Sequence, residues 1–288
     1  MKKVIIVLFG VVIIGFLGLG VLFVMYFSDF LRASYSPYVV ASVPYPQILH
    51  IEPITDIVIE EISKEDDYED EKEEINAEYL AMNLKTINNE LLPWNLQLVN
   101  HYNFLPADFT VELASIGNGH YIDARAFDSF VAMLNSAREE GLNIIVTSSF
   151  RTITHQRRLF DNRIARFMNE NGLDFYQAVE RTRQIIAYPG SSEHNLGLAI
   201  DFISREHKQL NAAFAQTPEG IWLRHNSYQY GFILRYNYNK THITNFIYEP
   251  WHFRYVGAKT ATTMFENNWS LEEYIAILLH NITNYELP

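Results

Sequence analysis

The chain has 288 residues, of which 48% are hydrophobic and 14% aromatic, which is enough apolar material for a sizeable core. It contains no cysteine, which excludes disulfide bonds and thiolate metal sites, so any bound metal ion must take histidine, aspartate or glutamate ligands. The formal net charge is −12, and the sequence offers no basic face, which argues against binding to DNA or RNA.

Most of the negative charge is concentrated in one short segment. Residues 60–74 include ten acidic residues and two lysines, for a net charge of −8. A block of this kind is typical of a solvated, disordered spacer. Calcium binding is the alternative, but the block lacks the glycine and the spaced ligand order of a calcium loop. We therefore expect residues 28–77, which end in this acidic low-complexity block, to form a stalk.

The N-terminus carries an uncharged apolar run from Val4 to Phe27, preceded by Lys2 and Lys3. A run of this length can cross about 30 Å of hydrocarbon as a helix. The two lysines on the short leading side place residues 1–3 in the cytoplasm and the rest of the chain outside the cell. A cleaved signal peptide is the alternative, but its apolar core is typically only about 7–15 residues long. The sequence thus predicts a single-pass membrane anchor and an extracellular domain over residues 78–288.

The predicted elements of this domain mix helices and strands without a regular alternation, which indicates an α+β fold. The apolar spacing from Phe127 to Ala137 predicts a helix, and Gly141 is a natural end for it. Asp174 and Gln177 form a pattern typical of a capping box at the start of a later helix. In chain order we expect a helix at 127–137, a strand at 142–146, helices at 154–171 and from 174 to about 188, a strand at 198–203, a helix from 217 to about 231, strands at 232–236 and 245–255, and a helix at 270–279.

Two short segments carry the chemistry that the sequence makes visible. They run from Ser192 to Asp201 and from Glu249 to His252, and together they supply two imidazoles and two carboxylates. This is the ligand chemistry of a catalytic zinc ion with a nearby base. Asp201 lies within an apolar, strand-like run, where a carboxylate is costly unless it is paired or bound to a cation. Metal ligation and a salt bridge to an arginine are equally open for this residue.

Strand geometry sets a condition on such a site. His194 and Asp201 are seven residues apart, and Glu249 and His252 are three apart. Because side chains alternate along a strand, an odd spacing on a straight strand points the two side chains to opposite faces. Each segment is therefore expected to turn for the site to close, at 195–197 and around Pro250. For the second segment, a base set back from the metal with His252 as the ligand is the alternative.

These residues resemble the zinc D-alanyl-D-alanine carboxypeptidases of the VanY type, with their L,D-carboxypeptidase relatives, in the LAS group of peptidases. The group signature S-x-H-x-x-G-x-A-x-D is met from Ser192 to Asp201, and the signature E-x-W-H is met from Glu249 to His252. The resemblance extends from about Leu96 to Gly257 and so covers most of the expected domain. It implies a single globular zinc-peptidase domain with a central antiparallel sheet flanked by helices.

The resemblance also implies a role for each matched residue. Zinc would be the cofactor, and Glu249 would be the general base. Arg151 would stabilise negative charge on the attacked carbonyl, and a structural salt bridge to an acid such as Asp201 is the alternative for this arginine. A serine before a turn also caps backbone groups, which qualifies the role of Ser192. The implied zinc ligands are His194, Asp201 and His252, and the implied substrate contacts are Ser192 and Gln156.

The implied activity is removal of the C-terminal D-alanine from peptidoglycan stem peptides, which an extracellular, membrane-anchored domain is placed to reach. L,D-carboxypeptidase or cell-wall endopeptidase activity would use the same ligands and depend on the shape of the pocket. A non-catalytic cell-wall binding domain is a further alternative, but such a domain is expected to have lost a ligand or Glu249, and none is lost.

Overall fold

The computed structural model describes residue 76, residues 80–81 and residues 87–285, with side chains described as far as residue 282. The apolar run Val4–Phe27 and the acidic block lie outside the described residues, so the predicted anchor and stalk remain predictions. Among the helices of the described part, none is both long and apolar enough to cross a bilayer.

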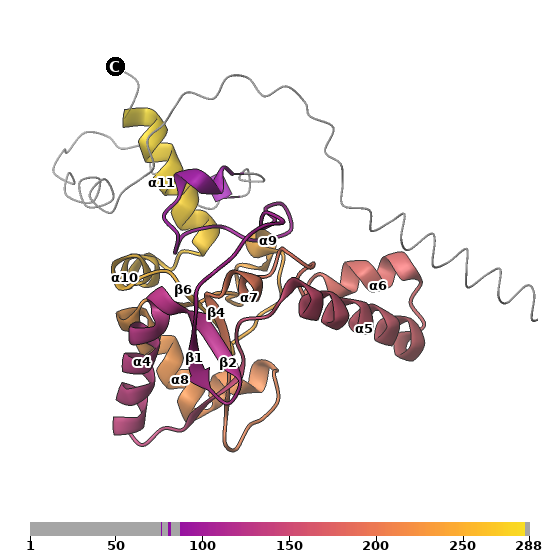
Figure 1. Ribbon diagram of the computed structural model, residues 1–288, viewed down its shortest axis with the longest axis horizontal. Coiled ribbons are helices and arrows are strands. Elements are labelled where there is room, and N and C mark those ends of the chain that lie inside the picture. The colour runs from indigo at the N-terminus through magenta and orange to yellow at the C-terminus, as the bar shows by residue number, and fades with distance from the viewer. Residues whose placement is uncertain (1–75, 77–79, 82–86, 286–288) are drawn as a thin grey trace, which may run out of the picture. The chain divides into compact units, whose positions relative to one another are not determined.

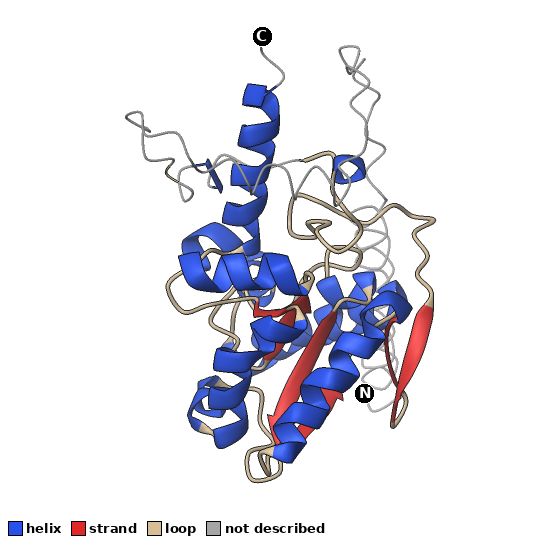
Figure 2. Cartoon of the chain, turned by 90° about the vertical axis from the view of Figure 1, so that its left-hand side faces the viewer, coloured by secondary structure: helices blue, strands red, loops and turns tan. Residues whose placement is uncertain are grey.

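A four-stranded antiparallel sheet forms the centre of the described domain (Figure 1; Figure 2). Its strand order is β3 (Ile144–Ser148), β4 (Ala199–Ser204), β6 (His252–Tyr255) and β5 (Phe232–Leu234). A separate hairpin pairs β1 (Leu113–Gly117) with β2 (His120–Asp123). Helices surround the sheet, which confirms the predicted α+β fold with a central antiparallel sheet flanked by helices.

The helices account for most of the remaining described residues. The α-helices are α4 (Phe127–Glu139), α5 (Ile153–Asn171), α6 (Phe175–Thr182), α7 (Glu193–Leu196), α8 (Pro218–Asn226), α9 (Thr241–Thr244), α10 (Ala258–Asn267) and α11 (Leu271–Tyr285). The short 3-10 helices are η1 (Asn89–Leu91), η2 (Ala124–Ala126), η3 (Ala212–Gln216) and η4 (Ser227–Tyr230).

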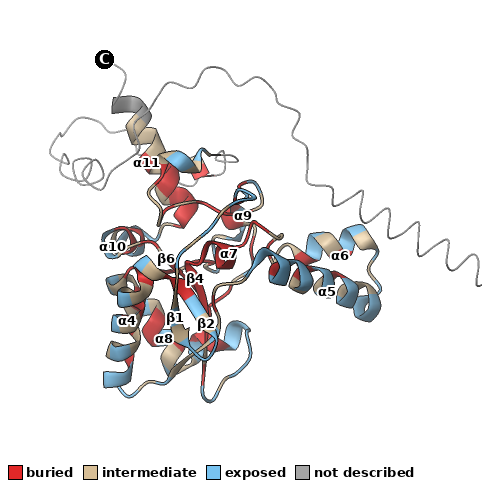
Figure 3. Cartoon of the chain, in the orientation of Figure 1, coloured by how far each residue is buried: buried red, intermediate tan, exposed pale blue. Residues whose placement is uncertain are grey.

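Strand alternation divides the apolar side chains of the sheet between two core clusters. Phe232 of β5 and Phe253 of β6 pack with apolar residues of α4 and α8 in the larger cluster. Ile233, the next residue of β5, belongs to a second cluster with residues of α10 and α11. Figure 3 shows that α7 and β4 lie among the most buried elements, which places them deep in the domain.

Helices α5 and α6 form a hairpin that projects to one side of the sheet (Figure 1). Gly172 ends α5 in the left-handed conformation at φ 66°, directly after the predicted helix 154–171. The Asp174 side chain accepts from the backbone of Gln177 and the Gln177 side chain accepts from the backbone of Asp174, so the predicted capping box is confirmed. Phe160, Ile164 and other apolar residues give the hairpin a small core of its own.

Three predicted elements are shorter than expected, and several observed elements were not predicted; the predicted strand 232–236, for example, ends at Leu234. The helix that begins after Asp174 ends at Thr182 rather than near residue 188, because the Gln184 and Ala187 carbonyls accept from Ile247 and Gln156 instead of continuing the helix. The predicted strand 245–255 is limited to His252–Tyr255, since a turn precedes it. The elements absent from the sequence prediction are the hairpin β1–β2, the helices α7, α9 and α10, and the 3-10 helices η1, η2 and η3.

Close backbone packing at Gly231 gives a test of the fold. A β-carbon there would lie 2.8 Å from the Tyr255 ring and 2.9 Å from the Ala258 nitrogen, at φ 84°. Gly141 has a similar φ of 80° but no atom within 4 Å of such a carbon. We expect Gly141→Ala to lower the free energy of unfolding by about 1–2 kcal/mol, and Gly231→Ala to lower it by about 1–3 kcal/mol more. Urea unfolding of both variants measures this difference, and equal losses would contradict the packing described.

Candidate metal centre

The sheet and one tight turn bring the three predicted ligands together. Gly197 ends α7 in the left-handed conformation at φ 84°, so the chain reverses between His194 and Asp201 as the sequence requires. Asp201 on β4 and His252 on β6 are directly paired across the sheet. Paired residues on adjacent antiparallel strands point to the same face, so these two side chains meet.

The second required turn is present at Pro250. The His252 amide donates to the Glu249 carbonyl over 3.0 Å, which closes a four-residue turn with proline at its second position. Proline is favoured there because its fixed φ suits the turn. The turn brings the Glu249 Oε2 atom to 3.7 Å from His252 Nδ1. Glu249 therefore lies beside the predicted ligands rather than on the opposite face.

The three predicted ligands form a compact, buried group. His194 Nε2 lies 3.2 Å from Asp201 Oδ2, and His252 Nδ1 lies 3.0 Å from Asp201 Oδ1. One donor atom from each residue falls within 4.8 Å of the others. The Asp201 Oδ1 atom is buried and has no hydrogen-bond partner, although His252 is near it. Two imidazoles and a carboxylate with an unsatisfied oxygen are a donor set that fits zinc.

Hydrogen bonding on the far side of His194 orients its ring. The His194 Nδ1 atom lies 2.8 Å from the Ser149 carbonyl oxygen, which can only accept. The ring proton must then be on Nδ1, and the Nε2 lone pair faces Asp201. Metal-ligating histidines typically donate their other N–H to a carbonyl or carboxylate in this way.

Arg151 lies against the ligand group. One guanidinium nitrogen, Nη2, is 2.9 Å from Asp201 Oδ2 and 3.2 Å from His194 Nε2. Its Nε donates to the Ser148 hydroxyl, and its Nη1 donates to the Gln156 amide oxygen. The salt bridge to Asp201 that the sequence left as an alternative is therefore present. It also fixes a positive charge at the edge of the candidate metal centre.

The two predicted substrate contacts line the same cavity and also have structural partners. The Ser192 hydroxyl accepts from the His194 amide at the start of α7, so it serves as a helix cap. Gln156 is fully buried, and its amide nitrogen donates to the Ala187 carbonyl while its oxygen accepts from Arg151. An amide group has a second N–H and a second lone pair. Substrate contact by these residues therefore stays a prediction.

Burial and charge shift the pKa values of the titratable groups. Burial raises the pKa of Glu249 to about 8. Burial and the neighbouring Arg151 lower the pKa of His194 to about 4. Burial alone would lower the pKa of His252, but contacts with Asp201 and Glu193 raise it to about 9. These values describe the protein without bound metal, in which His252 carries a proton at neutral pH.

A charged group behind His252 escaped the sequence analysis. Glu193 is buried, with its Oε2 atom 3.4 Å from His252 Nε2. Its Oε1 atom accepts from Arg235 over 2.7 Å and from Arg254 over 3.0 Å. The only available signal was its place beside His194 in the chain, because the two arginines lie more than 40 residues away.

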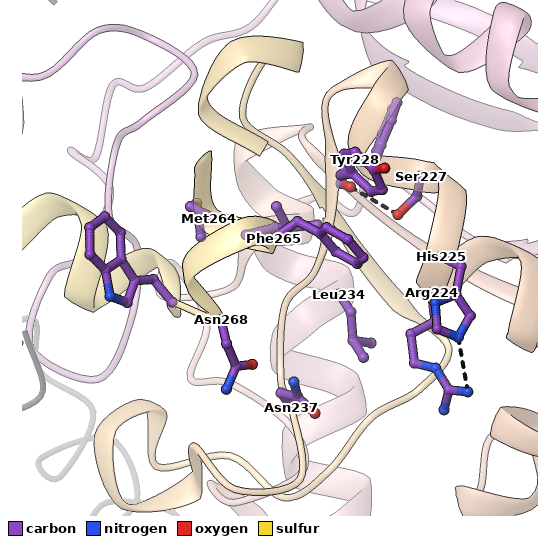
Figure 4. A pocket seen from close by; sticks show the side chains of 12 residues that line it. Arg224, His225, Ser227, Tyr228, Leu234, Asn237, Met264, Phe265 and Asn268 are labelled. Carbon is purple, nitrogen blue, oxygen red and sulfur yellow. Dashed lines mark hydrogen bonds between the residues drawn. The ribbon is translucent and has the colours of Figure 1, made fainter. Parts of the chain in front are cut away.

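The candidate chemistry is confined to one cavity. A cavity of about 350 Å³ is lined by the predicted ligands, Glu249, Arg151, Gln156 and Ser192. A second hollow, between α8, η4 and α10, is lined by residues such as Arg224, Tyr228 and Phe265 (Figure 4). The two share no lining residue. Among the described residues, only the group of His194, Asp201 and His252 has the composition and spacing to hold a metal ion.

A buried His–Asp–His group with a carboxylate and an arginine beside it defines the centre of a metallohydrolase. Residues 119–258 match the family described as VanY, D-alanyl-D-alanine carboxypeptidase. The chain is 39% identical over 183 residues to a D-alanyl-D-alanine carboxypeptidase of Enterococcus faecalis, covering 63% of this chain and 66% of that protein.

Two solved structures are also similar to the chain. The crystal structure of a VanY D,D-pentapeptidase mutant with Zn(II) is 38% identical, with a TM-score of 0.58, covering 64% of this chain and 99% of that one. The LdcB LD-carboxypeptidase structure is 34% identical, with a TM-score of 0.53, covering 70% of this chain and 87% of that one. The chain belongs to the VanY family of D-alanyl-D-alanine carboxypeptidases.

The raised pKa of His252 predicts how metal binding depends on pH. A metal ion can bind Nδ1 only after the imidazolium loses a proton, and this proton is held up to about pH 9. Apparent zinc affinity should therefore fall as the pH drops below 9, by up to about tenfold per pH unit. Calorimetry at neutral pH in buffers of different ionisation enthalpy should detect release of about one proton or more per zinc ion. Zinc binding without proton release would contradict the assignment.

Proposed function

We propose that the protein is a zinc-dependent carboxypeptidase that removes the C-terminal D-alanine from peptidoglycan stem peptides. The observation that carries this proposal is the buried group of His194, Asp201 and His252, with Glu249 beside it in the same cavity. Membership of the VanY family supports D-alanyl-D-alanine as the substrate class. The VanY D,D-pentapeptidase crystallised with Zn(II) supports zinc as the metal.

Glu249 has the position and the protonation behaviour of a general base. The two histidines and Asp201 would hold the zinc ion, which would supply an acidified water and polarise a carbonyl group. Glu249 accepts the proton of the attacking water and passes it to the leaving amine. Burial raises the pKa of Glu249 to about 8, so the residue exchanges a proton readily near neutral pH. A nearby divalent cation favours its ionised form, which is the form that a base requires.

Arg151 supplies a fixed positive charge for the oxyanion that develops on the attacked carbonyl. Its guanidinium is held by Ser148, Gln156 and Asp201, so little reorganisation accompanies the reaction. Preorganised donors of this kind contribute a few kcal/mol to transition-state stabilisation. Ser192 and Gln156 complete the wall of the cavity and contact the peptide.

Two substrates separate the main activity from its alternative. The family and the Enterococcus faecalis relative favour cleavage between two D-alanines, whereas the similarity to LdcB favours an L,D bond. We expect mass spectrometry of digested muropeptides to show loss of one alanine from pentapeptide stems and no change in tetrapeptide stems. Loss of alanine from tetrapeptides alone would assign the chain to the L,D activity. Cleavage of neither substrate would favour the alternative of a non-catalytic cell-wall binding domain.

Replacement of the base tests the mechanism itself. Glu249→Gln has nearly the same shape, and the protonated form of Glu249 is itself neutral, so we expect the variant to fold and to bind zinc. The rate of D-alanine release should fall by roughly 10²–10⁴-fold, the range for loss of a general base. The exposed Glu206 offers a matched change outside the cavity, and Glu206→Gln should keep the wild-type rate. Full activity in Glu249→Gln would rule out the proposed base.

We also propose that the apolar run Val4–Phe27 anchors the catalytic domain on the outer side of the cytoplasmic membrane. The support is the length of the run and the two lysines before it. The full-length chain should then stay in the membrane fraction after alkaline carbonate extraction, and external protease should digest its C-terminal domain in intact protoplasts. Release by carbonate, or protection from the protease, would contradict this topology.

A further inference from the structure

Glu193 lines the same cavity, but it differs from Asp201 and Glu249 because it contacts the other ring nitrogen of His252. Its Oε2 atom lies 3.4 Å from His252 Nε2, while His252 Nδ1 lies 3.0 Å from Asp201 Oδ1. The His252 ring therefore stands between two carboxylates, one at each nitrogen. Both carboxylates are almost completely buried, at 1% and 2% exposure.

We infer that Glu193 is a positioning residue that sets the tautomer and orientation of His252. A carboxylate at Nε2 can only accept, so when the imidazolium loses one proton, the remaining ring proton stays on that nitrogen. The lone pair of Nδ1 is then free to face the metal centre. This inference rests on the proposed function, because it concerns how the protein holds its metal ion, and it assigns no role in the chemical step to Glu193.

Two arginines keep the Glu193 carboxylate in place. Arg235 donates to Oε1 over 2.7 Å, and Arg254 donates to the same oxygen over 3.0 Å. Arg254 also donates to the carbonyls of Asn95 and Gln97, so its own guanidinium is fixed by the backbone. Both arginines need an acceptor at Oε1, which leaves only Oε2 to face His252.

A second carboxylate in this cluster provides a matched control. Arg235 also pairs with Glu272, at the start of α11, over 2.6 and 2.8 Å. Glu272 is 2% exposed, close to the 1% of Glu193. Both carboxylates pair with Arg235, but only Glu193 has a contact with His252. A purely structural role would make the two residues equivalent.

The decisive comparison is between Glu193→Gln and Glu272→Gln in the full-length chain. In Glu193→Gln the arginines retain the amide oxygen, so the NH₂ group faces His252 Nε2. A donor at that position moves the ring proton to Nδ1, the atom that the metal needs. Zinc affinity, measured by competition with a chromophoric chelator, should fall roughly 10–100-fold. Glu272→Gln should change it by less than about threefold, although both variants lower the melting temperature.

A shorter carboxylate covers the case in which Glu193→Gln does not fold. Glu193→Asp keeps the charge that the arginines require but withdraws the acceptor from His252, so its zinc affinity should also fall. Wild-type zinc affinity in a folded Glu193 variant, or an equal loss in Glu272→Gln, would overturn the inference. Absence of zinc binding by the wild-type chain would instead refute the proposed function, so the two failures are distinguishable.

Discussion

The domain depends on a carboxylate buried in the middle of its central sheet. Asp201 lies on an inner strand at 2% exposure, where an unpaired charge is strongly destabilising. Arg151 and two histidines surround it, and one of its oxygens still lacks a hydrogen-bond partner. The left-handed Gly197 brings His194 to it, and the pairing of β4 with β6 brings His252. The turn at Pro250 then places Glu249 beside the same group.

Pairing between buried carboxylates and arginines occurs on both sides of His252. The carboxylates of Asp201 and Glu193 lie on opposite sides of His252, and each is matched by at least one arginine. The cluster behind His252 includes Glu272 of the C-terminal helix, so residues far apart in sequence are fixed around a single imidazole. A rigid shell of this kind keeps ligands in place before a metal ion arrives, which is the condition for precise coordination.

The sequence predicted which residues come together at the site better than it predicted their surroundings. Signature spacing identified the two segments, and strand alternation required both turns, because these are local properties of the chain. The capping box of Asp174 and Gln177 is an equally local signal. The predicted strand 245–255 begins only at His252, because the turn closed by Glu249 precedes it and because Ile247 and Glu249 bond to the backbone of distant residues instead of continuing the strand. The pairing of Glu193 with two arginines more than 40 residues away depends on the folded chain, and no local pattern reveals it.

The position of the bound metal ion tests this account most directly. Anomalous diffraction at the zinc edge, from crystals of the zinc-loaded protein, locates the ion without reference to activity. The account predicts one ion within about 2.0–2.2 Å of His194 Nε2, His252 Nδ1 and an Asp201 oxygen. An ion bound elsewhere, or held through His252 Nε2 with Glu193 displaced, would contradict it.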